Sequence, residues 1–170
     1  MTKKKTFFLA VAIPLLILLA MTIKPQATVL FGQEIVLETK AFDPTDLFRG
    51  DYVSISFAIS DIPKSKVTLP FDKINSKNLY VGLKQEGKYY VVDQVSETKP
   101  KQGVYLKGKF QVIYNEFNEV DKFSVDYSLD KYFVKQGSGV DLQQDSYSGG
   151  LVGTVKVLSG YGVLTGIAPR

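Results

Sequence analysis

The feature that most constrains this chain is an uncharged, apolar segment near its N-terminus, residues 6–23. As an α-helix, 18 residues reach about 27 Å, close to the thickness of a bilayer's hydrocarbon core. Pro14 lies inside the segment, and proline is costly in soluble helices but tolerated in membrane spans. We therefore predict a cytoplasmic tail over residues 1–5, a transmembrane anchor over 6–24 and one extracytoplasmic domain over 25–170.

The charges around this segment predict its orientation. Three lysines at positions 3–5 precede the apolar run, and Lys24 follows it. The positive-inside rule then places the N-terminus in the cytoplasm and the remaining chain outside a single-pass cell-membrane anchor. The competing interpretation is a cleaved signal peptide, whose apolar core is usually about 7–15 residues long and ends at an Ala-x-Ala-like site. A retained signal anchor is favoured, because the apolar run is longer than this and Pro25, two residues before Ala27, makes a poor cleavage site there.

Composition excludes several classes of function. The chain has no cysteine and no histidine, so it has no disulfide framework, no thiolate or imidazole metal site and no Ser-His-Asp triad. Four of its 21 basic residues precede position 25, and the other 17 balance the 17 acidic residues. A neutral domain lacks the clustered positive charge that nucleic acids require. We therefore expect no nucleic-acid partner, no cofactor, no metal site and no catalytic residue.

Beyond the anchor, the hydrophobic pattern is typical of an all-β domain. Short runs of alternating character are bounded by turn residues, and no long segment has a helical period. The expected fold is a mainly antiparallel sandwich or partly open barrel with one N-terminal transmembrane helix. Single strands are expected over 33–40 and 51–60, and hairpins over 79–83 with 89–95, 104–114 with 119–127, and 151–158 with 161–167. We expect loops over 62–77 and 137–150, and a short helical turn over 129–133.

One segment carries a recognisable motif. Residues 50–57 read Gly-Asp-Tyr-Val-Ser-Ile-Ser-Phe, preceded by an Asp-Pro pair at 43–44 and a Phe-Arg pair at 48–49. This stretch resembles the signature of the GDYXXLXY family, with Ile55 in place of Leu and Phe57 in place of Tyr. Residues 127–139 are similar to a second segment of that family, Tyr-Gly-x-x-x-Tyr-Phe-Val-x-x-Gly, with a serine replacing its first glycine. The matching positions of this second segment are Tyr127, Tyr132, Phe133 and Gly137.

The resemblance covers most of the chain and implies a membrane-anchored exported protein of unknown activity. The motif itself has two interpretations. In the first it only shapes a turn and a strand: Gly50 supplies an unusual backbone conformation and Asp51 accepts backbone hydrogen bonds. In the second it is a binding site. The residues of that site are Arg49, Gly50, Asp51, Tyr52, Ile55 and Phe57.

Two classes of function remain. The first is a non-enzymatic module that binds another membrane or envelope protein, in addition to the lipid bilayer contacted by residues 6–23. The alternative is a small-ligand binder, or a relic of a signal-peptidase-like Ser/Lys hydrolase, at the Arg49-Gly50-Asp51-Tyr52 stretch. Type I signal peptidases also follow an anchor with a β-rich domain and have a similar Arg-Gly-Asp-x-Val stretch. Their Ser-Met-x-Pro segment is missing here, since methionine occurs only at positions 1 and 21.

Overall fold

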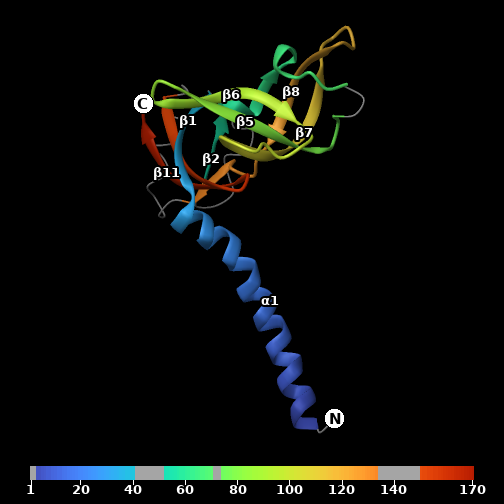
Figure 1. Cartoon of the computed structure of the whole chain (residues 1–170), viewed down its shortest axis with the longest axis vertical. Coiled ribbons are helices and arrows are strands. Elements are labelled where there is room, and N and C mark those ends of the chain that lie inside the picture. The colour runs from blue at the N-terminus through green and yellow to red at the C-terminus, as the bar shows by residue number, and fades with distance from the viewer. Residues whose placement is uncertain (1–2, 41–51, 71–73, 134–149) are drawn as a thin grey trace.

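The computed structural model describes residues 3–40, 52–70, 74–133 and 150–170. Its one long helix, α1 (Lys3–Phe31), projects from a β-domain like a stalk, with the N-terminus at the far end (Figure 1). Within the described chain, α1 is the one helix long and apolar enough to cross a membrane. It continues past the predicted anchor through Pro25 and ends where the Gly32 amide donates to the Thr28 carbonyl at 2.8 Å.

A four-stranded antiparallel sheet begins directly after the helix. Its strand order is β11-β10-β1-β3. The elements are β1 (Gln33–Lys40), β3 (Ser56–Phe57), β10 (Leu151–Leu158) and β11 (Tyr161–Pro169). β1 and β10 each bury alternate residues, as expected for strands with one face on a core. The last hairpin turns at Ser159 and Gly160, both at positive φ, which is the two-residue turn that the sequence predicts.

A five-stranded antiparallel sheet forms the rest of the core, in the order β4-β8-β7-β5-β6. Its elements are β4 (Asp61–Pro63), β5 (Asn78–Glu86), β6 (Tyr89–Ser96), β7 (Val104–Tyr114) and β8 (Val120–Asp126). Both predicted hairpins in this region are confirmed, and Gly87 takes the positive φ expected of it. The first hairpin is tighter than predicted, since β5 and β6 extend until only residues 87 and 88 separate them.

The two sheets are joined along the chain and by hydrogen bonds. A 3₁₀ turn, η1 (Ala58–Ser60), carries the chain from β3 to β4. Elsewhere a parallel bridge links Leu106 of β7 to Gly160, and the Lys107 amide donates to the Gly160 carbonyl at 2.8 Å. The result is a mainly antiparallel, partly closed barrel with one N-terminal apolar helix, which confirms the predicted fold class.

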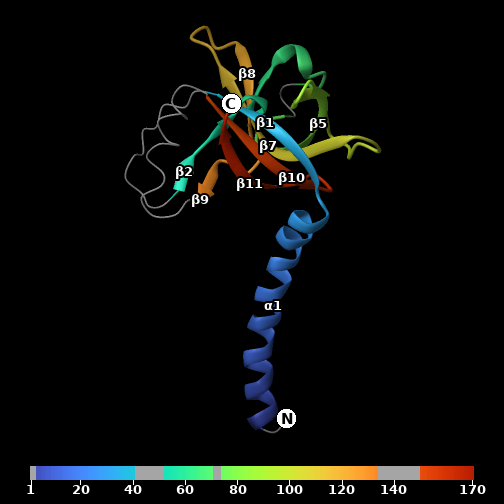
Figure 2. The ribbon, with the colours of Figure 1, turned by 90° about the vertical axis from the view of Figure 1, so that its left-hand side faces the viewer.

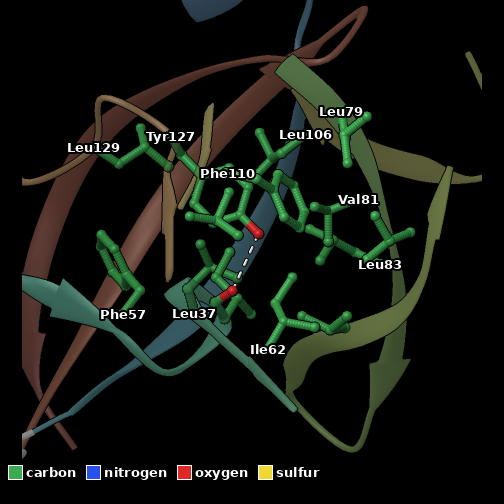
Figure 3. Close-up of a cluster of buried hydrophobic side chains, with 14 of the residues drawn as sticks. Leu37, Phe57, Ile62, Leu79, Val81, Leu83, Leu106, Phe110, Tyr127 and Leu129 are labelled. Carbon is green, nitrogen blue, oxygen red and sulfur yellow. Dashed lines mark hydrogen bonds between the residues drawn. The ribbon is translucent and has the colours of Figure 1, made fainter. Parts of the chain in front are cut away.

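The core lies between these sheets, and Figure 3 shows part of it. Side chains that are almost fully removed from water come from residue 74 and from β1, β3, β4, β5, β7, β8 and β10. The largest of these are Phe57, Phe110, Phe123, Ile35, Leu37, Ile62, Ile74, Leu106 and Leu151. Burial of this apolar surface, at about 25 cal/mol per Å², is the main force holding the domain together.

Three sequence predictions are wrong in detail. The expected strand over 51–60 is divided, within its described part, into β2 (Tyr52–Ser54), β3 and η1, because β2 and β3 pair with different partners. Its alternation still holds, since Ile55, Phe57 and Ile59 are all buried. The expected helical turn over 129–133 instead contains strand β9 (Lys131–Phe133), which pairs with β2 and whose two aromatic residues favour a strand. The expected loop over 62–77 contains the end of β4 and a 3₁₀ turn, η2 (Lys64–Lys66), and its residues 71–73 lie outside the described residues.

Candidate functional site

The two motif segments, far apart in the sequence, form neighbouring strands. β2 of the first segment pairs antiparallel with β9 of the second, with Tyr52 opposite Phe133 and Val53 opposite Tyr132 (Figure 2). The contact continues beyond the strands, because the Ile55 amide donates to the Asp130 carbonyl at 2.9 Å. The fold therefore joins the two segments into one structural unit.

The structure places only some of the predicted site residues. Arg49, Gly50, Asp51 and Gly137 lie outside the described residues. Tyr52 and Phe133 are placed by their backbone pairing alone. Of the predicted side chains, Ile55 and Phe57 are buried in the core, Tyr127 is buried and Tyr132 packs against the core half-buried. The apolar part of the motif therefore has a structural role, and the role of its charged part stays a prediction.

Two glycines make room for the aromatic residues of the motif segments. A Cβ atom on Gly153 of β10 would lie 2.6 Å from Cε1 of Phe57. A Cβ atom on Gly108 of β7 would lie 2.9 Å from Cδ1 of Tyr127 and 2.4 Å from Cγ1 of Val125. Real Cβ atoms do not approach so closely, so these aromatic rings occupy space that only glycine leaves open.

Tyr127 fixes the chain just after the first motif. Its hydroxyl donates to the Ile59 carbonyl at 3.1 Å, inside the core (Figure 3). Burial raises the pKa of this phenol far above its usual value, so it stays protonated and remains a donor at any physiological pH. A tyrosine held in this way secures the η1 turn and is a poor candidate for acid–base chemistry.

A bridging carboxylate follows the motif. Asp61, the first residue of β4, accepts hydrogen bonds from Lys40 of β1 at 2.8 Å and from Lys122 of β8 at 2.9 Å. Burial by itself raises the pKa of Asp61, but the hydrogen bonds and charges of the two lysines outweigh it and hold that pKa below its usual value. The three side chains link the four-stranded sheet to the five-stranded sheet.

The joined segments line an open cleft of about 280 Å³, here called the motif cleft. It is lined by the motif stretch 55–57, by residues 125–127 and by the segment at Asp130. Gln111 of β7 and Ser124 of β8, which are partners in the hairpin register, complete it. The cleft thus has an apolar floor and a polar rim.

The rim of the motif cleft is acidic. Asp126 and Asp130 are both exposed and line it, and none of its described lining residues is lysine or arginine. One oxygen of Asp126 accepts the Ser128 amide at 2.7 Å, which orients that carboxylate. The arrangement suits a ligand that combines an apolar group with a positive charge or hydrogen-bond donors.

Sequence reasoning missed these cleft residues. Asp126 comes directly before the second segment and Asp130 lies within it, but only the β2–β9 pairing brings them to the motif. The available signal was the predicted hairpin over 104–114 and 119–127, whose register places Gln111 opposite Ser124. That signal gives the neighbours across the hairpin but not their distance from Ile55.

The described lining of the motif cleft holds one of the two side chains of a Ser/Lys dyad. Ser56, Ser60 and Ser124 line it, yet no described lining residue is a lysine that would act as the base. Among the described residues, no group of three or more Asp or Glu side chains is placed to hold a metal ion.

The comparisons with known proteins agree with the motifs. No curated protein and no solved structure matches the chain. The model of the GDYXXLXY protein family matches residues 14–167, from within the apolar helix into the last strand, β11. The match therefore includes both motif segments and the strands around them, and the chain belongs to the GDYXXLXY family.

Proposed function

We propose that this chain is a membrane-anchored, non-enzymatic module that binds another membrane or envelope protein through the motif cleft. The observation that carries this proposal is the cleft itself, built where the two motif segments meet. Its open form suits a side chain presented by a larger molecule better than an enclosed small substrate. The expected partner segment places an apolar side chain on the floor and a lysine or arginine against Asp126 and Asp130.

The proposal includes an orientation. Helix α1 is retained as the anchor, its N-terminal lysines stay in the cytoplasm and the β-domain lies outside the cell membrane. Support comes from the exposed apolar surface of α1, whose large hydrophobic side chains from Phe7 to Ile23 pack against nothing in the domain. Exposure of such an apolar surface to water is unfavourable, whereas in a bilayer the same side chains contact lipid hydrocarbon.

A site-specific photo-cross-linker tests the partner. Placed at Gln111, an exposed residue of the cleft, it should give a discrete cross-linked protein in intact cells. Reversing a cleft charge with Asp130→Lys should abolish that product, because a basic partner residue would then meet a like charge. The matched control is Asp93→Lys, an exposed site on β6 at the opposite end of the five-stranded sheet from β8.

The outcomes separate the possibilities. Loss of the product in Asp130→Lys but not in Asp93→Lys supports the motif cleft as the binding surface. Equal products in both variants would mean that the partner binds elsewhere. Absence of any product would refute the partner-binding proposal.

A second candidate is binding of a small cationic ligand in the same cleft. Its volume of about 280 Å³ lies just below the ~300 Å³ at which small-molecule pockets begin, so the acidic lining favours a ligand that is both small and cationic. Cells would then give no cross-linked protein at Gln111. The purified chain would instead melt at a higher temperature with the ligand, by an increment that Asp130→Lys removes.

A further inference from the structure

A second cleft, of about 370 Å³, lies where α1 meets the β-domain. It is lined by Lys24 of the helix, by Lys107 and Lys109 of β7, and by the turn at 159–161. We call it the basic cleft. It is distinct from the motif cleft, although Asp126 and Tyr127 contribute to both.

The three lysines present their charge to this cleft for structural reasons. Lys107 and Lys109 are two residues apart on β7, so they share the outer face, while Leu106, Gly108 and Phe110 between and beside them are buried. Lys24 is held from the helix side, its Nζ 4.3 Å from the centre of the Tyr161 ring. Such a cation–π contact fixes the ammonium group without neutralising it.

Most of the positive charge of the basic cleft is uncompensated by the described residues. None of the ion pairs between described residues involves Lys24, Lys107 or Lys109. Asp126 is the one acidic residue in the described lining, where it faces Lys109 in the strand register and accepts the Ser128 amide. Three positive charges against one negative charge make this a site for an anion.

The position of the basic cleft indicates the source of that anion. Lys24 closes the apolar run of α1, which places it at the level of the lipid headgroups if the helix is anchored as proposed. Between Lys24 and the domain, Leu30 and Phe31 are 70% and 76% exposed, so apolar surface continues to the base of the domain. The basic cleft therefore opens at the bilayer interface.

We propose that the basic cleft binds the phosphate of an anionic phospholipid headgroup in the outer leaflet. This inference rests on the proposed anchoring and orientation of α1. Lysines supply a compact positive charge with three donors each, which is suited to phosphate oxygens. The bound headgroup would fix the tilt of the domain against the membrane and thereby the direction in which the motif cleft points.

The test uses the full chain in non-ionic detergent micelles and measures bound lipid by native mass spectrometry. Phosphatidylglycerol should bind in preference to phosphatidylcholine. The double variant Lys107→Gln/Lys109→Gln should lower the affinity for phosphatidylglycerol about 25-fold, since each lysine near an anionic headgroup contributes about fivefold. The affinity for phosphatidylcholine should not change.

Two controls make the result specific. Lys84→Gln/Lys88→Gln removes two exposed lysines at the β5–β6 hairpin, outside the basic cleft, and should bind phosphatidylglycerol as the unmodified chain does. Lys107→Arg/Lys109→Arg keeps the positive charge and should also bind phosphatidylglycerol. An equal loss in the hairpin variant, or no loss in the Gln variant, overturns the proposal.

A last arm distinguishes lipid from soluble phosphate. Inorganic phosphate at millimolar concentration should not displace phosphatidylglycerol from the chain. If it does, and if phosphatidylglycerol binds no more tightly than free phosphate, the basic cleft is a site for a soluble anion and the lipid assignment is wrong. Because binding is measured in micelles, this failure is independent of the cell-based cross-linking that tests the proposed function.

Discussion

The fit between Phe57 and Gly153 gives the sharpest test of how the motif is held. Replacing Gly153 with alanine would put a methyl group 2.6 Å from Cε1 and 2.8 Å from Cζ of the Phe57 ring, with Leu164 Cδ1 at 3.2 Å. Carbon atoms in contact normally lie about 3.5–4.0 Å apart, so the ring must move by close to 1 Å. Phe57 is 2% exposed and has no solvent into which to move. Overpacking of this kind costs about 1–3 kcal/mol, or roughly 3–10 °C in Tm.

The measurement is urea unfolding of the full chain in detergent micelles, followed by tyrosine fluorescence because the chain has no tryptophan. The control is Gly166→Ala on β11, which is paired with Thr154, next to Gly153, and has Thr154 Cβ at 3.9 Å as its nearest atom. That change should be neutral or slightly stabilising. In Gly153→Ala/Phe57→Leu the smaller side chain makes room, so the double variant should be at least about 1 kcal/mol more stable than the summed single effects predict. If the effects of Gly153→Ala and Phe57→Leu on the free energy of unfolding are additive, the close contact between these two residues is refuted.

Three further predictions follow from the same geometry. Tyr127→Phe leaves the buried Ile59 carbonyl without its donor and should lower the free energy of unfolding by about 1–2 kcal/mol in the same urea assay. The pKa of Asp61 is lowered in the folded state, so the ionised side chain adds to the free energy of unfolding. This stabilisation is complete above the pKa of an unfolded aspartate, about 4, and is lost as the pH falls through the lower pKa of the folded state. Asp61→Asn should therefore lower the free energy of unfolding by about 1 kcal/mol at pH 7. At low pH, parallel urea titrations should find the variant as stable as the unmodified chain. Protease added to protoplasts should digest the β-domain, while the full-length chain resists extraction with carbonate; recovery of a shorter soluble form would establish cleavage of the anchor.

The regular parts of this fold are predictable because their signals are local. Strands 33–40, 104–114 and 151–158 were predicted with the bounds that the structure gives, since alternating burial and turn residues define them within the sequence. The apolar helix was predicted for the same reason, although its continuation past Pro25 to Phe31 was not. Within that extension Thr28 is fully buried, and its hydroxyl donates to the Lys24 carbonyl at 2.9 Å.

The candidate site was less predictable because it depends on contacts across the fold. Alternation over residues 51–60 predicts which side chains are buried but not that β2 and β3 pair with different strands. Tyr132 and Phe133 favour a strand, but a run of three residues is too short to predict β9 without its partner β2. Gly108 and Gly153 also look like ordinary strand glycines until Tyr127 and Phe57 are placed against them.

The two clefts share a wall, and this determines which variants can separate their functions. Asp126 and Tyr127 lie between them, so a change at either residue would alter the acidic motif cleft and the basic cleft together. Asp130 lines only the motif cleft, and Lys107 lines only the basic cleft. If the chain uses both clefts, Asp130→Lys should abolish cross-linking to the partner and leave lipid binding unchanged. The Lys107→Gln/Lys109→Gln variant should lose lipid binding first, and any decrease in cross-linking would then measure how far headgroup binding orients the motif cleft.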